Sequence, residues 1–196
     1  MKNKKKLSLR TLCVGAGIFL FAAAAVLLLS WQVQIRICAQ RAEGRVEAIR
    51  TAIPTPQSAV PQERRDNTMP VLSLDGTDFV GLLELPRYDA ALPVCAVWGQ
   101  PSRYPCRFSG SVHDGTLQIG ATSQKGQLDF YRELSVGDTL YFTDMEGNRY
   151  AFTVTDLHYA KHADQAALSR EEAALTIFIK NVYAFEYLVV FCDVRQ

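Results

Sequence analysis

The residues best suited to chemistry in this sequence are a thiol–imidazole pair and a lysine at the end of an apolar run. Cys106 and His113 lie seven residues apart in "CRFSGSVH", so a thiol and an imidazole could form a nucleophile and its base. Lys180 ends "LTIFIK", and a desolvated lysine beside the hydroxyl of Thr122 or Ser123 could act as a base. Either arrangement depends on the elements that position these residues.

The other cysteines and histidines favour structural roles. His158 and His162 are four residues apart, and no further ligand completes a metal-binding pattern, so we expect neither a metal nor a cofactor. Cys95 and Cys106 are eleven residues apart. The sequence favours free, half-buried thiols at these positions and leaves a disulfide open in an oxidising compartment. Cys192 lies within an apolar run, which predicts a core residue.

The segment that must position these residues has the pattern of a β-rich domain. From Phe79 onward, short runs rich in Val, Ile, Leu, Phe, Tyr and Thr alternate with turn signals. The clearest hairpin is "FTDMEGNRYAFTV", where Gly147 and Asn148 suit a turn that needs positive φ. Helical patterns are confined to two short pieces, "QKGQLDFYREL" and "HADQAALSREEAA". Many short strands in one domain predict a sandwich or a barrel.

Length and charge limit the class of protein. With 196 residues, 48% of them hydrophobic, the chain can bury one substantial core. The formal net charge is +1, with 21 basic and 20 acidic side chains. A nucleic-acid-binding domain is usually clearly basic, so this balance argues against a nucleic-acid partner.

The N-terminal part of the sequence predicts a membrane anchor. Residues 1–10 form a basic stub without an acid, and residues 11–35 carry no charged side chain, which suffices for a helix across a hydrocarbon core about 30 Å thick. The basic stub should stay cytoplasmic, so we expect a single-pass anchor in the cell membrane with the remainder outside the cell. A cleaved signal peptide is the alternative, although "LLL" at 27–29 extends the apolar run beyond the usual length of such a peptide.

Residues 36–68 are expected to connect this anchor to the folded domain. The stretch "RICAQRAEGRVEAIR" is polar and compatible with a helical stalk. The stretch "IPTPQSAVPQERRDN" has three prolines and few apolar residues, which predicts an extended linker. The folded domain is therefore predicted over residues 69–196.

The order of features in this domain resembles that of a sortase. "FVGLLELPRYDAALPV" is similar to the first two strands of the family, which are joined through a proline. The chain then has a Gly-Ser turn, a strand, a Phe-x-x-x-Leu helix and a hairpin in the family's order, and "LTIFIKN" and "EYLVVFCDV" are similar to its last two strands. The resemblance implies a mainly β fold, a closed eight-stranded barrel with short helices and a cleft for a sorting-signal peptide. In the family a cysteine attacks the peptide, a histidine transfers the proton and an arginine stabilises the oxyanion.

This sequence departs from the family at all three catalytic positions. The strand-end motif Leu-Thr-Leu-x-Thr-Cys corresponds to "LTIFIK", which puts Lys180 at the cysteine. Thr122 in "IGAT" then stands at the histidine, and Tyr187 in "EYLVV" stands at the arginine. A protonated ammonium cannot carry out thiol chemistry, and losing a nucleophile together with its base removes many orders of magnitude in rate. The resemblance therefore implies a relative that has lost the family's activity.

Three functional hypotheses follow. We expect an inactive pseudo-sortase that binds sorting-signal peptides, holds a pilin-like protein or pairs with an active sortase. The second hypothesis is an active cysteine transpeptidase or hydrolase with a rearranged site, and turnover of a sorting peptide distinguishes it from the first. The third is a barrel unrelated to sortases, which a closed barrel with adjacent final strands would argue against.

Overall fold

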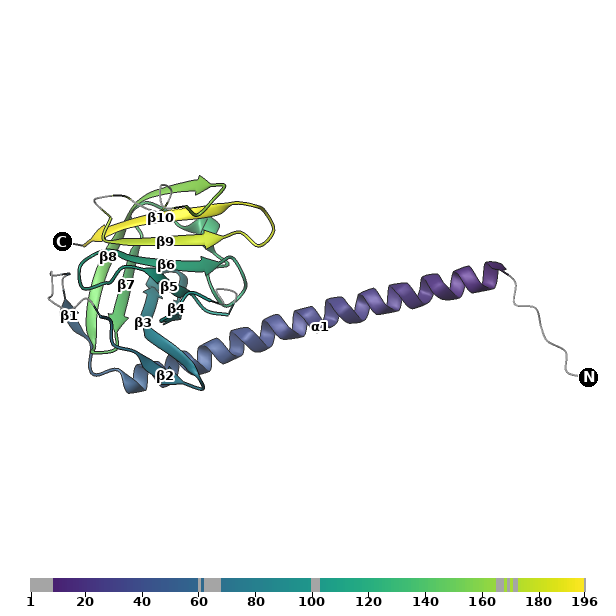
Figure 1. The fold of residues 1–196 in the computed structure, drawn as a ribbon, viewed down its shortest axis with the longest axis horizontal. Coiled ribbons are helices and arrows are strands. Elements are labelled where there is room, and N and C mark those ends of the chain that lie inside the picture. Colours follow the sequence, from purple (N-terminus) through teal and green to yellow (C-terminus); the bar gives the residue numbers. More distant parts are fainter. Residues whose placement is uncertain are drawn as a thin grey trace, which may run out of the picture. The chain divides into compact units, whose positions relative to one another are not determined.

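The computed structural model describes residues 9–59, 61, 68–99, 103–164, 168, 170 and 173–195. The chain divides into two compact units, Met1–Cys38 and Ala39–Gln196, which we describe separately. Helix α1 (Leu9–Ala52) runs through the boundary and contributes to both (Figure 1). Most of the stub predicted over residues 1–10 lies outside the described residues.

In the first unit, apolar side chains of α1 are exposed. Ile18, Phe19, Leu20 and Phe21 are each about two thirds exposed or more. Over the residues that the structure describes, no helix combines the length and the apolar character that crossing a membrane requires. Several side chains of the span predicted over residues 11–35 lie outside the described ones, so this anchor stays a prediction.

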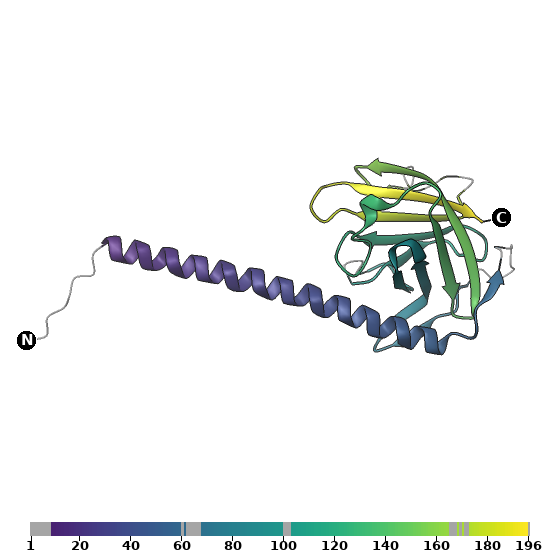
Figure 2. The same ribbon diagram turned by 180° about the vertical axis from the view of Figure 1, so that it is seen from behind.

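The second unit contains a barrel that closes on itself. The strands pair in the order β8-β10-β9-β6-β5-β4-β3, and β7 pairs with both β3 and β8, which closes the ring of eight described strands (Figures 1 and 2). The predicted closed eight-stranded barrel is therefore confirmed. Its strands are β3 (Thr77–Leu85), β4 (Ala90–Cys95), β5 (Cys106–Ser109), β6 (Leu117–Thr122), β7 (Thr139–Asp144), β8 (Asn148–Ala160), β9 (Leu175–Lys180) and β10 (Tyr187–Val194).

Short elements extend this barrel. Strand β1 (Gln57–Ala59) pairs parallel with β8, and β2 (Leu72–Leu74) pairs antiparallel with β3. Strand β1 lies inside the segment predicted as an extended linker, and its three residues join the sheet. Two 3₁₀ turns are η1 (Pro86–Tyr88) and η2 (Tyr131–Glu133), and η2 falls in the predicted "QKGQLDFYREL". The other predicted piece lies partly outside the described residues.

Strand β9 is buried on both faces up to its last residue. Its inward side chains Ile177 and Ile179 are at most 2% exposed and join the main core. The outward Phe178 is 1% exposed, because it packs with Leu168, Val189 and Phe191 in a second cluster. A strand covered on both faces reads as a continuous apolar run, which explains "LTIFI" and leaves the terminal lysine as the exception.

The end of α1 packs within the second unit. Ile49 is fully buried beside Phe79 and Tyr104, and the guanidinium of Arg45 lies 5.9 Å and 5.4 Å from those two ring centroids. Arg50 also pairs with Glu84 at 2.9 Å. The sequence predicted a polar stalk here, because the composition of a largely polar segment does not reveal that one of its isoleucines is buried. The last turns of α1 instead form part of the domain's packing.

Candidate functional site

The structure brings together the three positions singled out by the sequence. Thr122, at the end of β6, is the register partner of Lys180, at the end of β9, in a parallel pair. Lys180 is in turn the register partner of Tyr187, the first residue of β10, in an antiparallel pair. The three strands run side by side in both views (Figures 1 and 2). All three side chains therefore start from one end of the β6–β9–β10 sheet.

These three side chains differ in exposure. Lys180 is exposed, Tyr187 is partly buried and Thr122 is only 4% exposed. The Thr122 hydroxyl has no hydrogen-bond partner among the described residues. A buried hydroxyl without a partner costs about 1–3 kcal/mol, so Thr122 is a polar group that the described part of the fold leaves unsatisfied. The site thus offers one exposed ammonium, one phenol and one buried hydroxyl.

Backbone hydrogen bonds fix the loops that flank these residues. The Ser123 N–H donates to the Lys180 carbonyl at 3.0 Å, and the Ser123 hydroxyl accepts from the Val182 N–H at 3.1 Å. Gln127 holds the neighbouring backbone, because its side-chain oxygen accepts from the Thr122 N–H at 3.0 Å. The recorded link between Ser123 and Lys180 is through the backbone, so these contacts give no support to a serine–lysine base.

The turn between β9 and β10 is built on Asn181. Its N–H donates to the Glu186 carbonyl at 3.0 Å, and its side-chain amide donates to the Glu186 carboxylate at 3.1 Å. Its side-chain oxygen accepts from the Tyr183 N–H at 3.0 Å. This arrangement leaves Tyr183 79% exposed and Phe185 fully exposed, so aromatic side chains border the site.

A cleft of about 530 Å³ adjoins this end of the sheet. Lys180 and Tyr187 both line it, which makes it the natural place for a ligand that reaches them. The sequence did not predict that residues 161–164, which follow β8, would line this cleft together with the end of β9. The lining residues are Lys161, His162, Ala163, Asp164, Lys180, Phe185, Glu186 and Tyr187.

An aromatic cluster covers the outer face of β6 and β9 beside the site. The ring of Trp98 lies 5.4 Å from Phe108 and 5.3 Å from Phe178, measured between centroids. Gly120 allows this packing, because a Cβ there would lie 1.8 Å from the Trp98 ring. Phe178 in turn lies 6.5 Å from Tyr187, so the cluster continues to the three-residue site.

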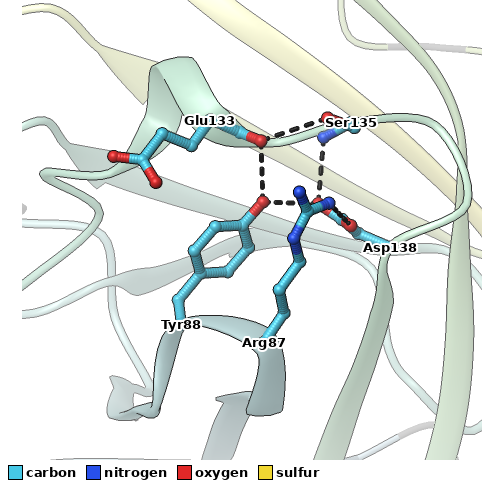
Figure 3. Close-up of polar contacts among 5 residues, drawn as sticks. All are labelled: Arg87, Tyr88, Glu133, Ser135 and Asp138. Carbon is cyan, nitrogen blue, oxygen red and sulfur yellow. Dashed lines mark hydrogen bonds and ion pairs between the residues drawn. The ribbon is translucent and has the colours of Figure 1, made fainter.

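A polar network fixes the loop that follows β6. The Tyr88 hydroxyl lies 2.6 Å from the Asp138 carboxylate and 2.8 Å from the Glu133 carbonyl, and Arg87 pairs with Asp138 at 2.5 Å (Figure 3). Burial alone would raise the pKa of Asp138, but hydrogen bonds from Tyr88, Arg87 and the Ser135 N–H hold it below its ordinary value. Burial and the hydrogen bond to Asp138 raise the pKa of Tyr88 to about 12. The network ties η1 to the loop before β7.

The alternative pair Cys106 and His113 has other neighbours. The Cys106 thiol contacts the Tyr104 carbonyl at 3.4 Å, whereas His113 lies 3.4 Å from the Asp144 carboxylate with both side chains buried. These contacts do not pair the Cys106 thiol with the His113 imidazole, so they give no support to a nucleophile and base at these positions. Cys192 is a fully buried core residue, as predicted. Among the described residues, no group of three or more His, Cys, Asp or Glu could hold a metal ion.

Comparison with known structures identifies the architecture. Sortase A from Corynebacterium diphtheriae, a lid mutant, matches with a TM-score of 0.53 and 16% identity, over 61% of this chain and 72% of that chain. Sortase C1 from Streptococcus agalactiae matches with a TM-score of 0.52 and 15% identity, over 63% and 71%. Sortase A from Listeria monocytogenes matches with a TM-score of 0.50 and 18% identity, over 60% and 88%. The chain has a sortase-like fold.

This fold bears on one hypothesis and leaves the site as a prediction. The barrel is closed and its last two strands, β9 and β10, are paired, so the structure lacks both features that would favour a barrel unlike that of sortases. No family model and no curated protein matches the sequence. At identities below one fifth, a sortase-like fold does not transfer catalytic roles residue by residue. The assignment of Lys180, Thr122 and Tyr187 to the catalytic positions stays a prediction.

Proposed function

We propose that this sortase-like domain binds an extended sorting-signal-type peptide at the Lys180 end of the barrel without cleaving it. The observation that carries the proposal is the register of Thr122, Lys180 and Tyr187 on three adjacent strands. Their side chains can donate and accept hydrogen bonds, but they include no thiol and no imidazole. These three positions can therefore hold a peptide carbonyl, and the cleft beside them adds the imidazole of His162 but no thiol that could act as the nucleophile of transpeptidation.

The chemistry of the site suits a polar backbone flanked by apolar side chains. The Lys180 ammonium has three N–H donors for a carbonyl or a carboxylate, and the buried Thr122 hydroxyl can pair with a further peptide group. Phe185 and Tyr187 line the same cleft and offer aromatic surface to a ligand's side chains. These features support the binding of a peptide segment. That segment belongs to a surface protein, or to the tail of a surface protein that an active sortase processes.

We also propose that the N-terminal segment anchors the domain to the cell membrane on its extracytoplasmic side. Support comes from the uncharged stretch at 11–35 after a basic stub, and from the exposure of Phe19 and Phe21 in the described part of α1. Exposed apolar side chains in a continuous run on a helix favour contact with an apolar phase. If the full-length protein stayed in the supernatant after cell lysis and ultracentrifugation without detergent, the proposed anchor would be wrong.

Peptide binding is tested by titrating the full-length protein with a fluorescent sorting-signal peptide. Lys180→Ala is expected to raise the Kd about tenfold, which corresponds to losing roughly 1.4 kcal/mol of a charge-assisted hydrogen bond. Lys125→Ala is the matched control, because Lys125 is exposed and does not line the cleft. Equal Kd values for the two variants would contradict the proposed site, and peptide turnover by the unaltered protein would contradict the proposed inactivity.

A further inference from the structure

Two cysteines lie directly opposite each other at the junction of β4 and β5. Cys95, the last residue of β4, is the register partner of Cys106, the first residue of β5, in a parallel pair. The Cys95 N–H donates to the Pro105 carbonyl at 2.8 Å, which fixes the two backbones side by side. No disulfide joins the two cysteines in this structure, and they are 8% and 1% exposed.

This placement meets the geometric requirement for a disulfide. Adjacent strands are about 4.8 Å apart, and disulfides join Cα atoms roughly 4.4–6.8 Å apart. The two side chains are also close to each other, because Cys106 is the first of the groups that raise the pKa of the Cys95 thiol. The sequence alone favoured two free, half-buried thiols; in the structure both are buried and close to each other.

We propose that Cys95 and Cys106 form an intramolecular disulfide, with a small-molecule or protein disulfide as the oxidant. One cysteine thiolate attacks the oxidant and releases one thiol as leaving group, which gives a mixed disulfide. The second thiolate then attacks the sulfur of the first cysteine and releases the other thiol. Two protein thiols and one external disulfide thus become one protein disulfide and two external thiols. This inference does not depend on the proposed peptide binding.

The surroundings of the two cysteines give an oxidant access to the thiols and influence the rate of oxidation. Both cysteines line a cleft of about 420 Å³ together with Asp78, Arg103 and Tyr104. A hydrogen bond between the Cys95 and Cys106 side chains, followed by burial, raises the pKa of the Cys95 thiol above its ordinary value. Because the thiolate is the attacking species, oxidation should be slow at neutral pH and accelerate as the pH rises.

The disulfide would strengthen the place where the end of α1 packs. Cys95 and Cys106 belong to one buried cluster with Ile49, Phe79 and Tyr104. The bond closes the loop from residue 96 to residue 105, so it restricts the unfolded chain and keeps that cluster together. Oxidation should therefore raise the thermal midpoint of the full-length protein, and reduction should reverse the shift.

The test maps the disulfide in full-length protein incubated with oxidised or with reduced glutathione. Free thiols are then blocked with N-ethylmaleimide, and the protein is digested with trypsin without a reductant. Trypsin cuts after Arg87, Arg103 and Arg107, so the bond would join peptide 88–103 to peptide 104–107. We expect this cross-linked pair after oxidation, with two of the five thiols lost and Cys192 still blocked by maleimide.

Cys106→Ser is the control variant, since it keeps the size of the side chain and removes one partner. It should give no cross-linked peptide and no redox-dependent shift of the thermal midpoint. Recovery of both peptides with maleimide on Cys95 and Cys106 after oxidation would overturn the proposal. A disulfide from Cys95 or Cys106 to another cysteine or to a second molecule would overturn it as well.

Discussion

Thr122 and Lys180 are register partners in the parallel β6–β9 pair, although 58 positions separate them in the sequence. A further antiparallel pairing places Tyr187 on the other side of Lys180. The barrel thus gathers a hydroxyl, an ammonium and a phenol at one end of three strands. None of these side chains is a thiol or an imidazole, and the proposal of peptide binding without transpeptidation rests on this difference.

Gly120→Ala should displace Trp98 from the outer face of β6. The new methyl group would lie 1.8 Å from the Trp98 ring and 2.7 Å from Phe178, so one ring must move. We expect a loss of about 1–3 kcal/mol in the free energy of unfolding and a red shift of tryptophan fluorescence. The measurement uses a Trp31→Phe background, because Trp31 and Trp98 are the two tryptophans of the chain.

Two further variants make this result interpretable. Gly99→Ala is the matched control, because nothing lies within 4 Å of a Cβ there, and it should leave the emission unchanged. Trp98→Ala combined with Gly120→Ala should cost less stability than the sum of the two single changes, because the clash is absent. Additive costs would show that Trp98 does not pack on Gly120.

Ile49→Ala should destabilise the domain although it lies on a segment predicted as a stalk. The side chain is fully buried with Phe79 and Tyr104, so its truncation leaves a cavity and should cost about 2–4 kcal/mol. Chemical denaturation of the full-length protein measures the cost. Glu47→Ala, at an exposed position of the same helix, should change the stability by less than about 0.5 kcal/mol. Equal effects of the two changes would mean that α1 does not pack through Ile49.

The strands could be predicted from sequence because each has its own local signal. "TLQIGA", "DTLYFTD" and "ALTIFI" lie within one residue of β6, β7 and β9. The hairpin turn was predicted correctly at Gly147, which has a φ of 85°, whereas Asn148 has no positive φ and begins β8. Strands of three residues such as β1 and β2 carry no such signal, because they form only through pairing with β8 and β3.

The candidate site was predictable in part. Its three positions came from the order of family features, and the strand registers bring them together. The cleft wall at Lys161 and the register pairing of Cys95 with Cys106 were not predictable, because both depend on how separate segments approach. The burial of Ile49 was missed for the same reason. Spacing along a chain carries no information about contacts made by the closure of a barrel.

Tyr88→Phe should change how stability depends on pH. The pKa of Asp138 is held below its ordinary value of 3.8, so its contribution to stability is present above that pH and is lost as the pH falls through the folded pKa. The pKa of Tyr88 is raised from 10.0 to about 12, so its contribution is present below pH 10 and is lost as the pH rises towards 12. The unaltered protein should therefore lose stability on both flanks of its pH profile, the acid flank and the alkaline flank.

Removing the Tyr88 hydroxyl should reduce the loss of stability on the alkaline flank, and it should also reduce the loss of stability on the acid flank. At neutral pH the change should cost about 1–3 kcal/mol, because the buried Asp138 carboxylate loses a hydrogen bond. Urea denaturation at a series of pH values measures both effects. Tyr183→Phe is the control, because Tyr183 is 79% exposed and its replacement should leave the profile unchanged. An unaltered alkaline flank in Tyr88→Phe would refute the assigned role.

Restoring the family residues tests whether Lys180 stands at the nucleophile position. In the triple variant Lys180→Cys, Thr122→His and Tyr187→Arg, a thiol at an exposed strand end would have an imidazole and a guanidinium on the register-paired positions. We expect a thioacyl adduct with a sorting-signal peptide, detected by intact mass. It should form about 10²–10⁴ times faster than in Lys180→Cys alone, because the imidazole supplies acid–base catalysis. The double variant Thr122→His and Tyr187→Arg retains Lys180 and should form no adduct. If the triple variant also formed none while still binding the peptide, Lys180 would not occupy the position of the attacking sulfur.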